Sequence, residues 1–376
     1  MANVIDLLAR LVAVDSVNPA YGGPGEAGVA TVVSDFLHGA GLETFTQRVH
    51  PGRDNVVAVL PGRDRSRRVV LEAHMDTVSA AGMSVPPFEP VVRDGRLHGR
   101  GACDTKAGLA AMMQAVADLR EAGTVPPCDV WMAAVVDEEH TFTGVLALVA
   151  DLVAHGAVVA EPTSLRIVTA TKGVLRFRIH VVGRAAHSSR PELGASAISA
   201  AARLVLALED VHASLTSATH PLLGHATGSI GTIQGGVQIN IVPESCTLAV
   251  DRRLLPGESA ADVLEDYRRL VAQVTAAGFC RATVESPLLV DDALETAPSA
   301  AVVRAAAAAA ESLGLAPIPV GVPYGSDASK FSRHGIPAIV FGPGSIDLAH
   351  AADEWVPVAE VESAVRFYRE LLLRFA

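Results

Sequence analysis

The chain has 376 residues, half of them hydrophobic, and 30 Lys and Arg against 41 Asp and Glu give a formal net charge of −11. A single hydrophobic core stops growing at about 250 to 300 residues, so this length predicts two domains. The negative charge repels phosphate backbones and argues against a nucleic-acid partner, whereas small polar or cationic partners fit better.

The cysteines and the N-terminal stretch indicate a compartment. The 4 cysteines are widely spaced and form no CxxC pair, which argues against a disulfide framework and a thiolate zinc cluster. Charges interrupt the first apolar stretch, as in an amphipathic helix and unlike a signal peptide. No apolar run approaches the about 18 residues of a spanning helix. We therefore expect a cytoplasmic protein with no membrane partner.

The first part of the chain alternates short β-branched runs with longer amphipathic segments, the βαβ pattern of a doubly wound sheet. The expected strands are residues 56–60, 68–72, 130–136 and 157–160, and residues 105–121 are an expected helix. The pattern changes at Lys172. Residues 174–182, 195–208, 228–234, 245–252, 260–276 and 281–286 then follow in β-α-β-β-α-β order, which is typical of a ferredoxin-like domain.

The last part returns to the first pattern, with a helix at 299–313, a buried strand at 338–341 and a helix at 360–373. The predicted fold class is therefore α/β, with a doubly wound mixed sheet and an inserted ferredoxin-like α+β domain. We expect the sheet domain to comprise residues 1–171 and 287–376, and the inserted domain to comprise residues 172–286.

Metal-ligand side chains follow four of the expected strands. In open α/β sheets, ligands bind beyond the carboxyl ends of the strands, because loops converge there. The chain has no P-loop, no GxGxxG and no GxSxG elbow, so nucleotide and serine-hydrolase chemistry lack their residues. The side chains that follow the strands are His74 and Asp76, Asp137 to His140, Glu161, and His350.

Asp104 adds a fifth group, in a glycine-rich stretch just before a helix. Two histidines with several carboxylates and no thiolate are typical of a hydrolytic zinc, cobalt or manganese centre, and their number suggests two ions. Each residue also has an ordinary interpretation. Asp104 could cap the helix, His74 could be a satisfied core histidine, and residues 137–139 could form a solvated acidic turn. These ordinary interpretations do not explain why successive strands each end in a ligand type at the same edge, so taken together the residues favour a metal centre.

Spacing separates the roles of neighbouring residues. Adjacent side chains on an extended backbone point apart, so one of Glu138 and Glu139 can bind metal while the other acts as a base. His74 and Asp76 are two residues apart and project to one side. Asp76 can therefore accept the ring N–H of His74 and fix its tautomer, or it could equally be a turn residue.

These stretches resemble the M20 metallopeptidases, which include acetylornithine deacetylase, succinyl-diaminopimelate desuccinylase and glutamate carboxypeptidase. The resemblance spans nearly the whole chain, in family order and with family-like spacing. It implies that the sheet domain is catalytic and that the inserted domain is a lid or dimerisation domain, which would make the protein a homodimer. The matching stretches are His74-Met-Asp76, Gly99 to Lys106, Asp137-Glu138-Glu139, Glu161-Pro162-Thr163, and Gly342-Pro-Gly to His350.

The resemblance also implies a ligand set for two Zn²⁺ ions, with Co²⁺ or Mn²⁺ as substitutes. Asp104 would bridge the two ions. His74 and Glu161 would complete one site. Glu139 and His350 would complete the other.

Catalytic and substrate-binding roles follow from the same resemblance. Glu138 matches the general base for a water activated between the two metals, and Asp76 supports the centre. His187 matches a lid histidine that, in dimeric relatives, reaches the partner's active site and helps hold the reacting carbonyl. The positions matching substrate-binding residues are Asn240, Arg253 and Gly342. Alone, Arg253 would more often be a surface charge and His187 a loop histidine.

Within the family, residues 342–354 are most similar to acetylornithine deacetylase, so we expect hydrolysis of the amide bond of a small N-acyl amino acid or short peptide. Ala107 and the stretch Thr141-Phe142-Thr143 depart from the glycine-containing family pattern, and substrate choice stays open. One alternative is a dipeptidase or carboxypeptidase with the same metals. A remoter one is a non-catalytic binding protein on the same fold, which would be expected to have lost ligands; none is lost.

Overall fold

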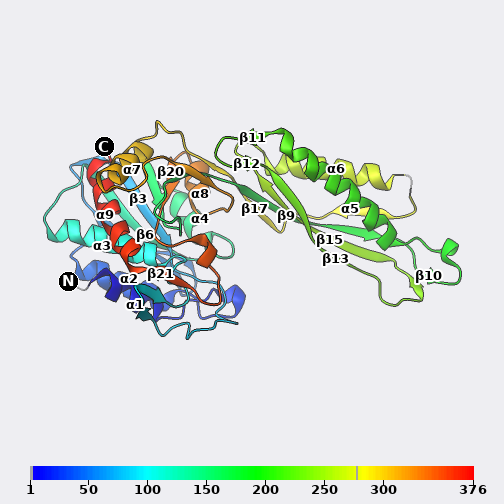
Figure 1. The fold of residues 1–376 in the computed structure, drawn as a ribbon, viewed down its shortest axis with the longest axis horizontal. Coiled ribbons are helices and arrows are strands. Elements are labelled where there is room, and N and C mark those ends of the chain that lie inside the picture. The colour runs from blue at the N-terminus through cyan, green and yellow to red at the C-terminus, as the bar shows by residue number, and fades with distance from the viewer. Residues whose placement is uncertain (1–2, 277) are drawn as a thin grey trace. The chain divides into compact units, whose positions relative to one another are not determined.

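The computed structural model describes residues 3–276 and 278–376, and the chain divides into two compact units (Figure 1). Unit 1 comprises the chain up to Thr169 together with Glu295–Val320 and Ser326–Ala376. Unit 2 comprises Ala170–Leu294 and Gly321–Gly325. The first two residues of the predicted first domain lie outside the described residues.

Unit 1 is built on a mixed sheet in the order β1-β2-β6-β3-β7-β20-β8-β18, with β19 paired to β8. The four central strands β6, β3, β7 and β20 are parallel, whereas β1, β2 and β8 are antiparallel to their neighbours. The strands are β1 (Glu43–His50), β2 (Arg53–Leu60), β3 (Asp64–His74), β6 (Cys128–Val135), β7 (Gly156–Val159), β8 (Val168–Thr171), β18 (Leu294–Glu295), β19 (Val320–Val322) and β20 (Ala338–Val340). β8, β18 and β19 run across the boundary between the units.

Helices cover both faces of this sheet, because buried apolar side chains project from both. On β3, Val69 and Leu71 join the core formed with α1, α3, α7 and α9, whereas Val70 faces the side of α4 and α8. Small residues keep α3 buried on nearly every side, so that it packs between α1 and α9. The helices are α1 (Val4–Val12), α2 (Ala27–Gly39), α3 (Lys106–Glu121), α4 (Thr143–Val149), α7 (Ala301–Ser312), α8 (Ala328–Arg333) and α9 (Val358–Arg374).

Unit 2 is an antiparallel sheet in the order β13-β15-β9-β16, with β17 paired to β9. On β15 the burial alternates strictly, with Cys246, Leu248 and Val250 inside, because α5 and α6 cover one face while the other face is open. The elements are β9 (Gly173–Val182), β13 (Thr227–Gly235), β15 (Ser245–Leu254), β16 (Arg281–Val284), β17 (Leu289–Asp291), α5 (Ala197–Ser214) and α6 (Ala260–Thr275).

Short strand pairs complete the two units. In unit 1, β4 (Val91–Arg93), β5 (Arg96–His98) and β21 (Trp355–Pro357) form a small sheet in the order β21-β5-β4. In unit 2, β10 (Ala186–His187) pairs with β14 (Ile241–Val242), and β11 (Thr219–His220) with β12 (Gly224–His225).

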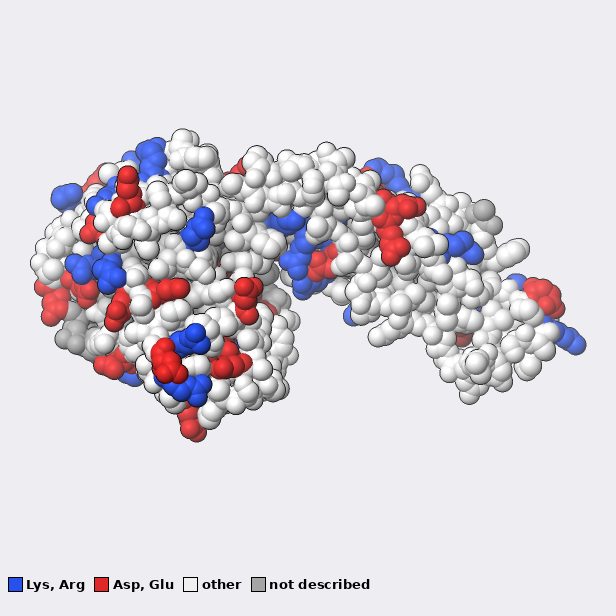
Figure 2. Space-filling model, viewed as in Figure 1, with Lys and Arg blue, Asp and Glu red and all other residues white. Residues whose placement is uncertain are grey.

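The predicted fold class is confirmed: a doubly wound mixed sheet is combined with an inserted α+β unit. Among the described residues, none of the helices combines the length and the apolar character needed to cross a membrane. On the visible face of the molecule, acidic and basic side chains are interspersed (Figure 2).

Candidate metal centre

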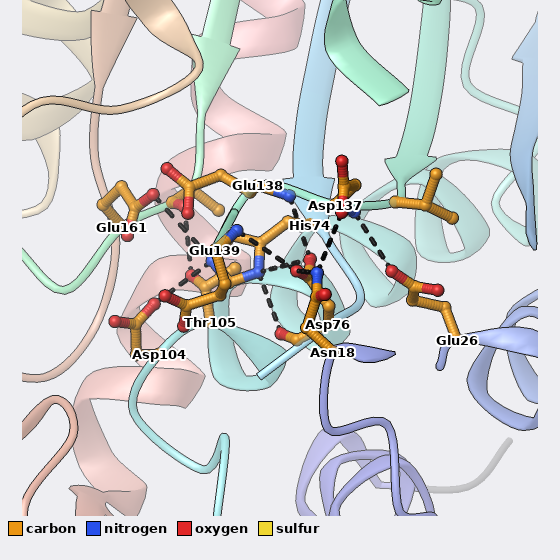
Figure 3. Close-up of polar contacts among 12 residues, drawn as sticks. Asn18, Glu26, His74, Asp76, Asp104, Thr105, Asp137, Glu138, Glu139 and Glu161 are labelled. Carbon is orange, nitrogen blue, oxygen red and sulfur yellow. Dashed lines mark hydrogen bonds and ion pairs between the residues drawn. The ribbon is translucent and has the colours of Figure 1, made fainter. Parts of the chain in front are cut away.

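The carboxyl ends of the parallel strands bring the predicted ligands together. His74 is the last residue of β3, and Glu138 and Glu139 follow the neighbouring strand β6. Glu161 follows β7, and the loop after β20 leads to His350. Asp104 joins them from the loop that precedes α3, so that most of these side chains converge in Figure 3.

Asp104 lies between two imidazoles. Its Oδ1 is 3.2 Å from His74 Nε2, and its Oδ2 is 3.3 Å from His350 Nε2. Glu161 Oε1 lies 4.0 Å from His74 Nε2, while Glu139 Oε1 lies 3.2 Å from His350 Nε2. Each oxygen of Asp104 therefore faces one histidine, and each histidine has a glutamate beside it.

Two sets of three residues each offer ligand atoms that all lie within 4.8 Å of one another. The first set is His74, Asp104 and Glu139, and the second is His74, Glu138 and Glu161. The second set contains the residue predicted to be the base. Glu138 is therefore near enough to act at the centre, and its carboxylate accepts no hydrogen bond from any described residue. The structure thus brings all five predicted ligands and the predicted base to one place.

Burial and mutual repulsion raise the pKa values of the glutamates at this centre. Burial raises the pKa of Glu161 well above its usual range, and the negative charges of Asp104 and Glu138 add to this shift. Burial likewise raises the pKa of Glu138 to about 8, with a further contribution from Glu139. The pKa of Glu139 is also raised, by burial and then by Asp104. Several acids packed together in this way need added positive charge to ionise.

The histidines supply part of that charge. Hydrogen bonds to Asp104 and Glu139 raise the pKa of His350 to about 10. Burial opposes protonation of His74, but Asp104 and Asp76 outweigh it and hold its pKa well above the usual value. Burial would also raise the pKa of Asp104, yet hydrogen bonds from His350 and His74 hold it below the usual range.

The donor set fits divalent metal ions. Imidazole and carboxylate ligands without thiolate suit zinc, cobalt or manganese. Metal cations would also supply the neighbouring positive charge that the ionised forms of Glu161 and Glu138 need. The Glu161 carboxylate has no hydrogen-bond donor among the residues that the structure describes. Such a buried, acceptor-only group suits coordination to a cation.

Asp76 supports the centre in two ways. Its backbone carbonyl is 3.0 Å from His74 Nδ1, closer than its carboxylate at 3.5 Å. The carboxylate instead accepts the backbone N–H groups of Glu138 and Glu139, each at 3.1 Å. Asp76 therefore orients the histidine mainly through its main chain and fixes the turn that carries the two glutamates.

Glu354 anchors the loop of Asp104, a role that the sequence pattern does not reveal. Its buried carboxylate accepts the backbone N–H groups of Gly101, Cys103 and Asp104 at 2.9 to 3.0 Å. It also forms a buried ion pair with Arg100 at 2.6 Å. No periodic or spacing signal marks a residue that binds backbone 250 positions away.

A second missed group lies behind the Glu138 turn (Figure 3). Asn18 donates to both Asp76 and Asp137, at 2.8 and 3.0 Å. Arg53 pairs with Glu26 at 2.6 Å and with Asp137 at 3.0 Å. Asp137 has a φ of 71°, which a side chain tolerates when hydrogen bonds hold it in place. In the sequence, the one signal for this group was the Asn18-Pro19 pair, and an Asn-Pro pair indicates only a turn.

The predicted substrate-binding residues are divided between the units. Gly342 belongs to unit 1, where a Cβ would lie 2.6 Å from the carbonyl oxygen of Glu161, so a side chain would disturb that ligand's backbone. His187, Asn240 and Arg253 belong to unit 2. His187 and Asn240 are both exposed. They lie close together, because the backbone N–H of Ser188 donates to the carbonyl of Asn240 at 3.0 Å.

Comparison with known proteins agrees with this geometry. Residues 70–374 match the model of peptidase family M20/M25/M40. The chain is 34% identical to acetylornithine deacetylase of Myxococcus xanthus, over 89% of this chain and 85% of that protein. It is 32% identical to a probable carboxypeptidase of Aspergillus clavatus, over 92% of this chain and 78% of the relative.

A solved structure shows the same fold along the whole chain. Aminopeptidase PepT of Bacillus cereus superposes with a TM-score of 0.83 at 25% identity, covering 99% of this chain and 98% of the other. Family, fold and ligand cluster thus agree. The chain belongs to peptidase family M20/M25/M40, and it is a metal-dependent hydrolase of that family.

Proposed function

We propose that the protein is a dinuclear zinc-dependent amidohydrolase that cleaves the amide bond of an N-acyl amino acid. The observation that carries this proposal is the position of Asp104, whose two oxygens face His74 and His350 separately. A carboxylate in that position is suited to bridge two ions. His74 and Glu161 would hold one ion, and Glu139 and His350 the other.

The metal ions, when bound, would supply Lewis acidity that polarises a carbonyl and makes water more acidic. The protein supplies the proton transfer. Glu138 lies beside the ligands, and its carboxylate is not engaged by any described hydrogen-bond donor, so it is available to hold a proton. It would take the proton from the attacking water and return it to the nitrogen of the leaving amine.

The remaining assignments concern substrate and assembly. His187 would help hold the reacting carbonyl, and Asn240, Arg253 and Gly342 would contact the rest of the substrate. A homodimer formed through unit 2, with His187 acting on the partner's site, and a cytoplasmic location belong to the same proposal. We expect no nucleic-acid or membrane partner.

The name of the Myxococcus xanthus relative supports a deacylase. The carboxypeptidase and aminopeptidase relatives favour a second candidate, a peptidase with the same metal centre. A panel of substrates separates the two. Zinc-reconstituted protein would be assayed against N-acetylornithine, other N-acyl amino acids, succinyl-diaminopimelate and dipeptides, and we expect the fastest turnover on N-acyl amino acids.

Glu138→Gln tests the base. The variant should bind two metal ions per chain and lose about 10²- to 10⁴-fold in kcat, the usual contribution of a general base. Glu43→Gln, at an exposed site on β1, is the matched control and should keep full activity. Substantial turnover by metal-loaded Glu138→Gln would remove Glu138 from the mechanism, and activity that survives exhaustive chelation would refute the metal-dependent reaction.

A further inference from the structure

Lysine is rare in this chain and occurs only at buried positions. Of the 30 Lys and Arg residues, only Lys106, Lys172 and Lys330 are lysines, and all three are buried. Lys106 and Lys172 each donate to a main-chain carbonyl. Lys330 Nζ donates to the carbonyl of Ser326 at 3.1 Å, but it also has a contact of another kind. The place of Lys330 must therefore be explained by its buried surroundings.

The Lys330 ammonium lies over an aromatic ring. Its Nζ is 3.4 Å from the centroid of the Phe142 ring. An ammonium over the face of a ring is attracted by the ring quadrupole, and the attraction is stronger where water is excluded. Lys330 belongs to α8, and Phe142 is the N-cap residue of α4, a helix that contacts α8 (Figure 1). The contact therefore joins α8 to the end of the loop that carries Glu138.

The backbone of Phe142 has an unusual conformation. Its φ is 61°, in the left-handed region that glycine and asparagine adopt more readily than a bulky residue. Such a conformation persists where the surroundings hold it. The N–H of Phe142 donates to the carbonyl of Asp137 at 2.7 Å, and Thr143 Oγ1 donates to the Asp137 carboxylate at 2.7 Å. The contact with Lys330 supplies a reason for an aromatic ring at a position whose backbone favours a smaller residue.

The loop between β6 and α4 is held at both of its ends. In its first part, Asp76 accepts the N–H groups of Glu138 and Glu139, and the Tyr21 hydroxyl donates to the carbonyl of Glu139 at 2.7 Å. At its last residue, the Phe142 ring ties the loop to α8. The two ends are thus fastened to different parts of unit 1, with both glutamates between them.

Three acid groups lie close to the Lys330 ammonium. Glu72 and Asp327 are almost fully buried, and their carboxylate oxygens have no hydrogen-bond partner among the described residues. Burial raises the pKa of these two groups and of Glu138, and in each case the charge of Lys330 acts in the opposite direction. An ammonium that the ring holds in one place therefore supplies positive charge to the acids on this side of the centre.

We propose that Phe142 and Lys330 are positioning residues for Glu138. The ring holds the ammonium on α8, and the pair fixes the end of the loop so that the Glu138 carboxylate stays beside the metal ligands. Both residues act through the loop and not on the substrate. The part in catalysis rests on the proposed function, whereas the ring contact and its effect on the loop do not. The alternative is a contact that serves only the packing of α4 against α8.

NMR on the full-length protein without substrate tests the contact itself. With three lysines in the chain, labelling of lysine Cε gives three signals, and the signal lost in Lys330→Arg belongs to Lys330. The ring current of Phe142 should shift the attached protons upfield. The shift should disappear in Phe142→Asn and persist in Phe142→Tyr. Asparagine tolerates the left-handed backbone and caps helices well, so this variant removes the ring with little other disturbance. A Lys330 signal that does not change in Phe142→Asn would overturn the contact.

Zinc titration tests the effect on the loop without turnover. Glu139 lies in the same loop, so Phe142→Asn should weaken the binding of one zinc ion about tenfold, as loss of a residue that supports a ligand does. Phe142→Tyr should bind zinc as the unsubstituted protein does. Phe279→Asn, which removes a 90% exposed aromatic side chain from unit 2, is the control and should leave zinc affinity unchanged. Equal zinc affinity in Phe142→Asn and the unsubstituted protein would contradict the role in holding the loop.

Turnover by the zinc-saturated enzyme tests the part in catalysis. Phe142→Asn should lower kcat about tenfold at unchanged KM, because Glu138 acts in the transition state and not in substrate binding. Lys330→Met should lower kcat similarly, and the double variant should lose no more than either single one. Losses that add, a change in KM alone, or a loss in Phe142→Tyr as large as in Phe142→Asn would refute the proposal.

Two further outcomes are also decisive. If Lys330→Met does not fold, the comparison of Phe142→Asn with Phe142→Tyr still separates positioning by the ring from a role in packing alone. An enzyme that hydrolyses none of the substrates would refute the proposed function, while the NMR signal and the zinc titration would still decide whether the ring holds the ammonium and the loop.

Discussion

The candidate metal centre of unit 1 and the Arg176–Asp251–Arg253 cluster of unit 2 both contain several charged side chains, but they differ in burial. In the first, the acids and His74 are largely withdrawn from water, whereas His350 is exposed, and burial raises the pKa of Glu138 to about 8. In the second, the Asp251 carboxylate lies 2.7 Å from Arg176 Nε and 2.8 Å from Arg253 Nε, and the two arginine side chains are 47% and 29% exposed. The buried cluster needs a cation, whereas the partly exposed one already contains two basic groups for one acid.

Burial, more than the number of charges, therefore decides how much a charged group contributes to stability. A charge pair in water contributes little to stability, because water solvates the separated charges almost as well. A buried charge without its partner is costly. Substitutions in the two regions should therefore differ greatly in effect.

Removal of the Asp104 carboxylate should have the largest effect. Asp104→Ala leaves both histidines without their shared acid, so we expect loss of at least one bound metal and at least about a thousandfold fall in kcat/KM. Metal per chain would be measured by atomic emission and activity on the best N-acyl substrate. Asp35→Ala, on the exposed side of α2, is the control. Full metal content in Asp104→Ala would exclude Asp104 as a shared ligand.

Loss of the loop anchor comes next. Glu354→Gln removes the single carboxylate charge that pairs with Arg100 and accepts three backbone N–H groups, so the free energy of unfolding should fall by about 3 kcal/mol. Metal affinity should fall by about 10- to 100-fold, because the Asp104 loop loses its support. The neighbouring Asp353→Asn is the control, since that side chain is 46% exposed. Equal stability of the two variants in urea denaturation would contradict a structural role of Glu354.

The pH dependence of the metal-free protein should show the buried acids directly. A raised pKa means that folded Glu138 and Glu161 bind more protons than the unfolded chain above about pH 4.5, so stability falls as pH rises. His350, with a pKa raised to about 10, acts in the same direction above about pH 6.5. From pH 6 to 8 we expect a loss of at least about 1 kcal/mol. Zinc should abolish most of it, and a flat denaturation profile without metal would contradict this reading.

The smallest effect belongs to exposed pairs. Arg269 pairs with Asp266 on α6, and both side chains are 65% exposed. Arg269→Ala should change the free energy of unfolding by less than about 0.5 kcal/mol, and salt should reduce the difference further. Denaturation at low and high salt measures both. A loss of several kcal/mol would show that exposure is a poor guide to the value of a charge here.

The sequence predicted the parts of the site that depend on local pattern. His74, Glu138, Glu139 and Glu161 each follow a strand whose apolar run is visible, and parallel strands end at one edge. The strand β1 was not predicted, because Glu43–His50 alternates few apolar residues and lies largely exposed. Partners distant in sequence were also missed. Glu354 and Asn18 act through contacts that exist only after folding, and their own neighbours carry no matching pattern.

The position of β20 has a consequence for synthesis. This strand lies between β7 and β8 in the sheet, although some 170 residues separate it from both in the chain. A growing chain therefore leaves the edges of β7 and β8 unpaired until residues 338–340 have been made, and such open edges favour aggregation. All of unit 2 has been synthesised by then. The unit that begins first is finished last, and its candidate metal centre is complete only when His350 and Glu354 have been made.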